Sequence, residues 1–225
     1  MLLFEFARRR ARSDAPYRIF YVERKRLKNY FAGSKVTMTK QMTPIFTVHA
    51  GEYLVGTHLE RTFPNCRVWI PSKDSGIDLL VTNGSCSRAV SLQVKYSRDY
   101  VDSSRSPNDP TFLSVTRNSF ITVKRDKIEA SPARFWVIVL HSFTVKSPRF
   151  LVITPSELLK RIEVHHGRRT SYICYFNIVG KTKCWDMRAP RAEMKTALEK
   201  GAISHSRDFS DRLDDWSKIR REIGV

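Results

Sequence analysis

The fold is decided by residues 75–97, SGIDLLVTNGSCSRAVSLQVKYS. Apolar residues recur at alternate positions in two runs of this stretch, 77–82 and 89–97, and such alternation predicts half-buried strands. The tripeptide Asn-Gly-Ser at 83–85 separates the two runs and is typical of a hairpin turn. We therefore expect two antiparallel strands joined by a short connection.

Alternation also predicts which polar side chains share a face of these strands. Gln93 and Lys95 lie two positions apart, so they project from the same face, about 7 Å from each other at a rise of ~3.3 Å per residue. Asp78 stands alone within the apolar first run. Pairing of the strands would bring the carboxylate, the amide and the ammonium group to one edge of the sheet. An ordinary half-buried strand has the same alternation, and it is the isolated aspartate combined with Gln-Val-Lys on a basic chain that favours a site.

Oxygen-donating side chains of this kind fit Mg²⁺, which prefers carboxylates, waters and phosphate oxygens as ligands. We expect the ligands to be the Asp78 carboxylate, the side-chain carbonyl of Gln93 and the backbone carbonyl of Val94, with Mn²⁺ able to replace Mg²⁺. Such an ion lowers the pKa of a bound water and screens the charge that builds on a phosphate. Lys95 would orient the attacking water and stabilise the charged transition state.

A further acid, Glu52, belongs to a helix predicted at 51–63. Val55, Leu59 and Phe63 recur at helical spacing, and the following proline ends the pattern. Glu52 lies on the face that we expect to pack on the sheet, where a carboxylate is costly unless it is paired or bound to a metal. The alternative is that this acid only complements the helix dipole with its carboxylate in water. Both interpretations stay open at this stage.

The rest of the chain predicts a mixture of strands and helices. Further strands are expected at 66–71, 135–140, 150–153, 171–179 and 183–186, and further helices at 124–130, from Pro155 onward, 191–200 and 210–222. The unbroken apolar run at 135–140 indicates a strand that is buried on both faces. Residues 98–118 are rich in Ser, Asp, Pro and Arg and predict a long irregular loop. This order of elements is typical of an α/β or α+β domain.

The charge of the chain points to a polyanionic partner. Its 225 residues include 40 Lys and Arg against 22 Asp and Glu, a formal net charge of +18, which favours nucleic acid. No run approaches the ~18 consecutive apolar residues of a membrane span, and Arg8 follows the opening apolar residues too early for a signal peptide. We therefore expect a cytoplasmic protein with no membrane partner.

Cysteine and histidine usage predicts no zinc module. The four cysteines form no C-x-x-C pair, so we expect reduced thiols in strands or loops. The pair His165-His166 is followed by Gly167 and two arginines, which indicates an exposed turn rather than a metal site.

The basic residues are concentrated at the start of the chain, where residues 1–40 hold 11 Lys and Arg against 3 acids. We assign 1–46 as a basic arm, which either binds nucleic acid or is a solvated, disordered tail. Met38 and Met42 offer a third interpretation, in which the working protein starts there. Residues 47–155 are expected to form the core, and 156–225 an α/β extension that adds to the sheet or mediates homodimerisation.

Three segments together resemble the PD-(D/E)XK nuclease superfamily, which includes many restriction endonucleases and archaeal Holliday junction resolvases. They are AGEYLV at 50–55, SGIDLL at 75–80 and SLQVKYS at 91–97, and the resemblance covers about half of the chain, 48–155. It places Asp78 on the motif aspartate, Gln93 on the second acidic position and Lys95 on the motif lysine. Glu52 falls on the acid of the first helix. Ile77 replaces the motif proline, and Gln93 removes one negative charge from the metal site.

The resemblance implies a restriction-endonuclease-like α/β core, in which a mixed central sheet is flanked by helices, and a magnesium-dependent endonuclease that acts on DNA in restriction, defence or junction processing. The alternative is a module on a degenerate nuclease fold that binds nucleic acid without cutting it. In either case we expect phosphate contacts from basic residues, namely Arg98, Arg105, Arg117, Lys124 and Arg125. A third interpretation is an interaction protein whose charge serves only solubility.

Overall fold

The computed structural model describes residues 49–73, 75–97, 114–142 and 147–225. The predicted arm at 1–46 and two of the predicted phosphate contacts, Arg98 and Arg105, lie outside these residues. Within the described part of the chain, no helix has the length and apolar character that crossing a bilayer requires.

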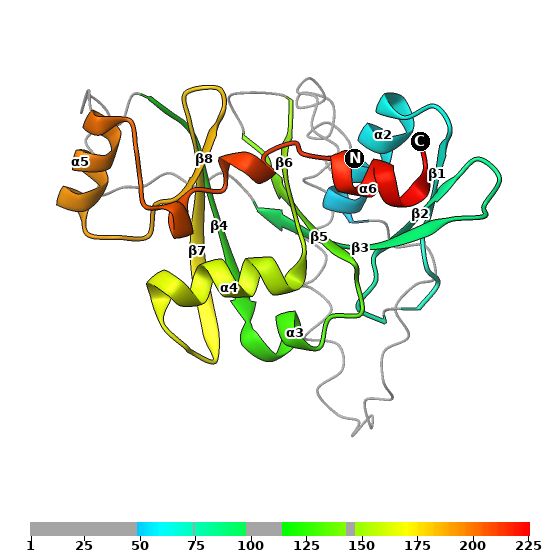
Figure 1. The fold of residues 1–225 in the computed structure, drawn as a ribbon, viewed down its shortest axis with the longest axis horizontal. Coiled ribbons are helices and arrows are strands. Elements are labelled where there is room, and N and C mark those ends of the chain that lie inside the picture. Colours follow the sequence, from blue (N-terminus) through cyan, green and yellow to red (C-terminus); the bar gives the residue numbers. More distant parts are fainter. Residues whose placement is uncertain (1–48, 74, 98–113, 143–146) are drawn as a thin grey trace, which may run out of the picture. The chain divides into compact units, whose positions relative to one another are not determined.

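The first sheet has five strands in the order β1-β2-β3-β5-β6, and Figure 1 labels them. They are β1 (Cys66–Trp69), β2 (Leu79–Asn83), β3 (Ala89–Ser97), β5 (Phe135–Leu140) and β6 (Arg149–Ile153). The β3–β5 pair is parallel and the other pairs are antiparallel, so the sheet is mixed. The predicted hairpin is confirmed, and its register pairs Leu79 with Leu92.

The second sheet is antiparallel, and its strands are β4 (Val115–Lys124), β7 (Ser171–Val179) and β8 (Lys183–Asp186) in that order. The predicted loop 98–118 is therefore wrong at its end, because β4 begins at residue 115. Buried polar residues interrupt the alternation of apolar and polar positions in β4, so the sequence pattern does not reveal this strand. The backbone N–H of Ser119, for example, donates to the Asn177 side chain at 3.2 Å, and both residues are fully buried.

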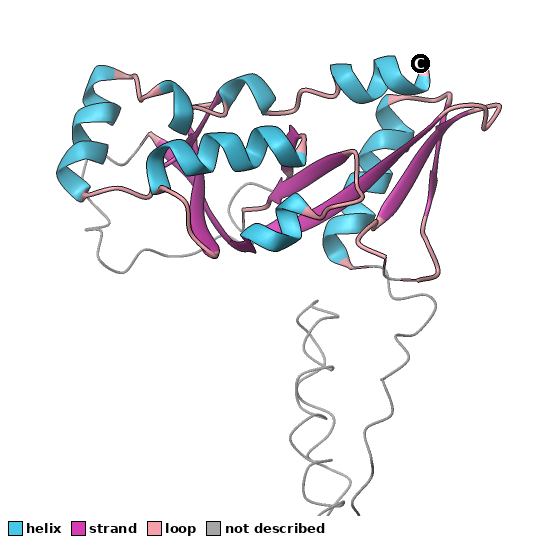
Figure 2. Ribbon diagram, turned by 60° about the horizontal axis from the view of Figure 1, so that its bottom comes forward, coloured by secondary structure: helices cyan, strands magenta, loops and turns pink. Residues whose placement is uncertain are grey.

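Helices flank the sheets, as Figure 2 shows by colour. They are α2 (Ala50–Thr62), α3 (Arg125–Glu129), α4 (Pro155–His166), α5 (Arg191–Lys200) and α6 (Ser217–Ile223). The start of α4 follows the predicted signal, since the Thr154 hydroxyl accepts the backbone N–H of Glu157 at 3.3 Å and proline follows the cap. The mixed α/β fold class with helices around a mixed sheet is thus confirmed.

Both faces of the first sheet are covered, and every residue of β5 is buried, as its apolar run predicts. On one face, Val137 and Val139 pack with α2 and α6. On the other face, Trp136 and Ile138 pack with α3, α4 and the second sheet. Figure 1 shows α2 and α6 beside the β1–β3 strands. The C-terminal helix therefore belongs to the same core as the helix that carries Glu52.

The single helix predicted at 210–222 is wrong, because the chain forms a 3₁₀ turn at Ser210–Arg212 and then α6. Asp214, with a φ of 56°, breaks the helix between them. Its carboxylate accepts the backbone N–H of Phe150 at 2.8 Å and pairs with Arg149. These contacts tie the break to the edge strand β6, which no local pattern in 210–222 reveals.

The interpretation of His165-His166 as an exposed turn is also wrong. Both residues still belong to α4, which ends at Gly167 with a φ of 69°. Their side chains are only 5% and 10% exposed, because both contact the buried carboxylate of Asp186. The four cysteines, Cys66, Cys86, Cys174 and Cys184, are free thiols.

Candidate active site

A cleft of about 980 Å³ opens where β2 and β3 separate, and the four residues singled out in the sequence, Glu52, Asp78, Gln93 and Lys95, all line it. Its walls come from the start of α2, the segment before β2, the strand β3, and the end of α3 with the loop that follows. The structure thus brings together side chains that lie up to 43 positions apart in the chain.

Asp78 lies one residue before β2 rather than inside it, so the predicted strand 77–82 is shifted toward its end. Its backbone N–H still donates to Leu92 at 2.8 Å, which extends the hairpin by one bond. Its side-chain Oδ2 accepts the backbone N–H of Val94 at 2.6 Å and a hydrogen bond from the Gln93 amide. Among the described residues nothing donates to Oδ1, so this oxygen is available to a ligand.

The Val94 carbonyl, which was predicted as a metal ligand, is oriented toward the same side. The N–H and C=O of one residue point to the same side of an extended strand. Because the N–H of Val94 points at Asp78, its carbonyl also faces the edge where Asp78 lies. The three residues that carry the carboxylate, the amide and the backbone carbonyl, Asp78, Gln93 and Val94, all line the cleft.

Lys95 is held over an aromatic ring rather than extended into water. Its Nζ lies 5.4 Å from the centroid of the Trp136 ring, a cation–π distance. The indole N–H of Trp136 donates to the Ser131 hydroxyl at 2.8 Å, which fixes the ring. The ammonium group is thus positioned at the cleft by a side chain of the neighbouring parallel strand.

Glu52 caps its own helix and also lines the cleft. Its Oε2 accepts the backbone N–H of His49 at 3.1 Å, which caps the start of α2. The residue is nevertheless only 9% exposed and lines the cleft, so its carboxylate is not simply solvated. Gly51 allows this position, because a Cβ there would lie 3.0 Å from the Cβ of Tyr96 on β3. The close approach of helix and strand brings Glu52 to the edge that holds Asp78.

Sequence reasoning did not single out several residues that line the cleft, among them Lys127, Ser131 and Trp136. Trp136 lies in the apolar run of β5, which indicates only core, and Ser131 follows a short helix with no motif. Lys127 is exposed on α3 and adds a second ammonium group at the cleft. The parallel pairing of Gln93 with Trp136 could reveal these residues, but it depends on a crossover that the sequence does not show.

No protein-family model and no curated protein matches the chain. Among solved structures, a bacterial homing endonuclease matches with a TM-score of 0.31 and 15% sequence identity, over 67% of this chain and 92% of that chain. An identity and a TM-score of this size leave the function to be inferred from the geometry of the cleft.

A second, smaller groove is also lined by residues of α3, and its lining holds more basic than acidic side chains. Its lining includes Lys124, Arg125, Arg168 and Arg169, with the acids Asp126 and Glu129. Lys124, Arg168 and Arg169 are exposed, so their charges are open to a polyanion. Lys127, on the same short helix, lines the cleft. Helix α3 therefore contributes basic side chains to both the cleft and the groove.

The predicted phosphate-binding residues differ in whether their positive charges are already paired with acidic side chains of the protein. The guanidinium of Arg125 donates to Glu163 at 2.8 Å and pairs with Glu129, whereas Lys124 is exposed. Arg117 lies in β4. Lys124 is therefore the better placed of the two residues at this groove.

Proposed function

We propose that the protein is a metal-dependent endonuclease that hydrolyses phosphodiester bonds in DNA, with the cleft at Asp78 as its active site. The observation that carries the proposal is the convergence of Glu52, Asp78, Gln93 and Lys95 on one cleft. Two acids, an amide and an ammonium group at the edge of a mixed sheet are also the groups that the PD-(D/E)XK resemblance assigns to catalysis. The net charge of +18 supports a polyanionic substrate.

The donor atoms in the cleft fit a hard divalent cation such as Mg²⁺ or Mn²⁺. Asp78 offers Oδ1, and the Val94 carbonyl faces the same edge. The Gln93 side chain can present its oxygen after rotation of the amide, and Glu52 supplies a second carboxylate at the wall. All of these are oxygen ligands, and no thiol lines the cleft among the described residues, which favours Mg²⁺ over softer ions.

A bound Mg²⁺ would supply Lewis-acid stabilisation of the phosphate charge and a more acidic water. The residues of the chain do the rest. Asp78 and Glu52 hold their carboxylates where the scissile phosphate must approach, and the contact with Val94 prevents Asp78 from rotating away. Lys95 donates hydrogen bonds to the attacking water or to the phosphate oxygens, and Trp136 restricts its ammonium group to that position. Lys127 at the wall adds charge that attracts the DNA backbone.

A second candidate function is binding of nucleic acid without cleavage. The observation that favours it is Gln93, because an amide takes the place of a carboxylate beside Asp78 and lowers the negative charge available to a cation. The basic groove at Lys124, Arg168 and Arg169 would serve this function equally well. The two functions differ in their response to magnesium, which affects cleavage strongly and salt-dependent binding little.

The test is cleavage of plasmid, single-stranded and branched DNA by the full-length protein with Mg²⁺, with Mn²⁺ and with chelator. We expect metal-dependent cutting that is lost in Asp78→Ala and in Lys95→Ala, while far-ultraviolet circular dichroism shows both variants folded at the assay temperature. Lys200→Ala on α5, a lysine far from the cleft in the chain, is the control and should cut normally. Retention of cleavage in both cleft variants would reject this active site, and salt-sensitive binding without any cleavage would favour the second function.

A further inference from the structure

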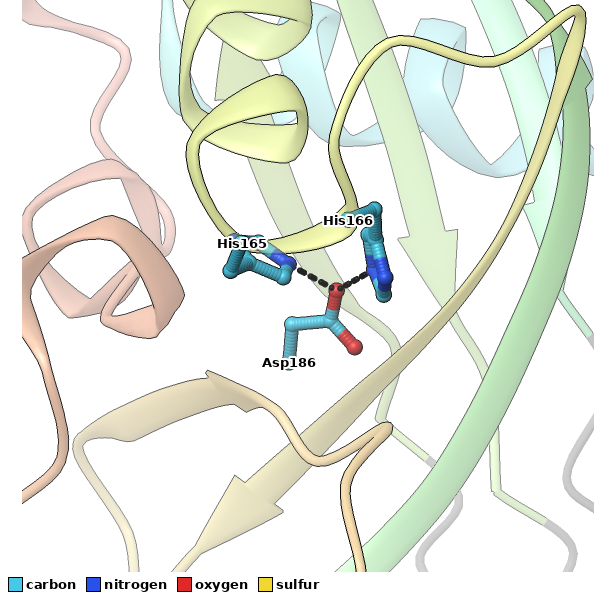
Figure 3. A group of neighbouring side chains, drawn as sticks. All are labelled: His165, His166 and Asp186. Carbon is cyan, nitrogen blue, oxygen red and sulfur yellow. Dashed lines mark hydrogen bonds and ion pairs between the residues drawn. The ribbon is translucent and has the colours of Figure 1, made fainter.

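Three side chains meet at a place that the proposed nuclease does not use. His165 and His166 are the last two residues of α4, and Asp186 is the last residue of β8. The Nε2 atoms of the two histidines lie 2.9 and 3.0 Å from the same oxygen, Oδ2 of Asp186. Figure 3 shows both imidazoles directed at this oxygen. All three ligand-type atoms lie within 4.8 Å of one another. None of these residues lines the cleft at Asp78.

The carboxylate is fixed in its orientation before anything binds. Its other oxygen, Oδ1, accepts the backbone N–H of Tyr175 at 3.0 Å and that of Arg188 at 3.2 Å. These two bonds turn Oδ2 toward the imidazoles. Asp186 has no exposed side-chain surface, so its rotation is also blocked by packing. Metal ligands are commonly oriented in this way by hydrogen bonds to the atoms that do not bind the ion.

The carboxylate of Asp186 is enclosed by its neighbours. Both imidazoles contact the same one of its oxygens, and its side chain has no exposed surface. The Nδ1 atom of His165 is buried and has no hydrogen-bond partner among the described residues. A buried anion with two imidazoles on one oxygen is a preformed set of cation ligands.

We propose that His165, His166 and Asp186 bind a divalent transition-metal ion, with Zn²⁺ as the best match. Two imidazole nitrogens and one carboxylate oxygen are ligands that zinc accepts in tetrahedral sites, and a water is the fourth ligand. Zinc–ligand bonds of ~2.0–2.1 Å place neighbouring ligand atoms of a tetrahedral site roughly 3.3 Å apart. The two Nε2–Oδ2 distances, 2.9 and 3.0 Å, therefore need to increase by only a few tenths of an ångström. Mg²⁺ is disfavoured because it prefers oxygen ligands.

The ion would have a structural role, because it joins the end of α4 to the end of β8. The two nearest ligands in the sequence, His166 and Asp186, are 20 residues apart, and Gly167 and the strand β7 lie between them in the chain. Binding to the folded chain alone stabilises it by mass action. At a free Zn²⁺ concentration ~100 times the Kd, we expect the unfolding midpoint to rise by roughly 5–10 °C.

The experiment uses full-length Asp78→Ala protein, so that an ion bound in the cleft is not counted with the ion at the histidines. The protein is stripped with chelator and titrated with Zn²⁺ by calorimetry, and bound metal is measured by elemental analysis after gel filtration. A parallel titration with Co²⁺ follows the visible d–d absorption, which reports nitrogen and oxygen ligands in a low-symmetry site. We expect one equivalent of Zn²⁺, and affinity on the order of 100-fold weaker after His166→Gln, a variant that keeps a polar side chain at the same place.

The matched control is His205→Ala, which removes an exposed histidine and should bind Zn²⁺ like the parent. His165→Gln is the second ligand variant, and far-ultraviolet circular dichroism in chelator shows whether each variant is folded. Absence of stoichiometric binding by the parent overturns the proposal. Equal binding by His166→Gln, His165→Gln and His205→Ala overturns it as well. Because cleavage is not measured, the result is independent of the fate of the proposed nuclease activity.

Discussion

The carboxylate of Asp78 accepts the backbone N–H of Val94 at 2.6 Å, two residues beyond the last Cα pair of the β2–β3 hairpin. The side chain thus continues the ladder after the two strands separate. Val94 lies between Gln93 and Lys95, so one hydrogen bond sets the position of the acid relative to the amide and the lysine. A substitution at position 93 is therefore expected to act on Asp78 directly.

The first prediction concerns Gln93→Glu, which introduces the carboxylate that PD-(D/E)XK nucleases, which the sequence resembles, have at the corresponding position. Gln93 now donates to Asp78, and a glutamate there would place two anions side by side. Without divalent ion we expect the unfolding midpoint to fall by a few degrees, and with Mg²⁺ to recover and exceed that of the parent. Thermal unfolding in chelator and in Mg²⁺ measures this. Gln93→Met removes the hydrogen bond without adding charge, and a midpoint that responds to Mg²⁺ equally in both variants would contradict an ion that the side chain at position 93 binds together with Asp78.

The residues of this site were accessible to sequence reasoning because each depends on local order. Alternation sets the face of Gln93 and Lys95, the hairpin turn sets the position of Asp78, and helical spacing sets that of Glu52. Trp136 was not accessible, since a strand buried on both faces has no pattern that marks one residue as part of a cleft. His165 and His166 were misinterpreted for a related reason, because their burial comes from Asp186, 20 residues beyond the helix.

The fold was predictable to a similar extent. Strands with clear alternation, such as Ala89–Ser97 and Ser171–Val179, were predicted with the bounds that the structure shows. The strand β4 was missed because Ser119 is fully buried among polar and apolar residues and breaks the alternation. The C-terminal region was predicted as one helix because nothing local shows that Asp214 pairs with Arg149. Long-range contacts, rather than propensity, decide both cases.

The second prediction tests whether the C-terminal helix is part of the core. Trp216, which caps α6, is 5% exposed, and its ring lies 5.4 Å from that of Phe150 on β6. We expect Trp216→Ala to destabilise the protein by about 3–5 kcal/mol, as measured by urea unfolding, because it leaves a cavity between sheet and helix. Trp69→Ala is the control, since Trp69 is 48% exposed, and it should cost clearly less. Equal costs for the two would mean that α6 does not stabilise the first sheet.

The third prediction concerns stability at mildly acidic pH. His58 on α2 stacks on Phe150 and Trp216, at centroid distances of 4.7 and 5.1 Å, and burial lowers the pKa of its imidazole, while Asp214 opposes this weakly. The unfolded chain then binds a proton near pH ~6.5 and the folded chain only at lower pH, so stability falls as the pH drops below about 6.5. Unfolding free energies between about pH 7.5 and pH 5.5 measure this slope.

His58→Phe keeps the aromatic ring and removes the titrating group, so its stability should change less over the same pH range. An unchanged slope in this variant would assign the acid sensitivity to other groups. Titration of the His58 ring protons by NMR gives an independent reading, and a pKa at or above the ordinary value would contradict the effect of burial.

The last prediction tests whether the basic groove and the cleft bind the same nucleic acid. Lys127 lines the cleft, and Arg168 is exposed in the basic groove; residues of α3 line both, so a duplex that lies along α3 would place phosphates near both cations. Each phosphate contact adds about one counterion to the salt dependence of binding. We expect Lys127→Ala and Arg168→Ala each to reduce the slope of log K against log salt by about 1, and the double variant by about 2. The measurement is fluorescence anisotropy with labelled DNA in the Asp78→Ala background without Mg²⁺, so that no strand is cut. Lys200→Ala should leave the slope unchanged, and a double variant that loses no more than one single variant would mean that only one of the two cations contacts the DNA.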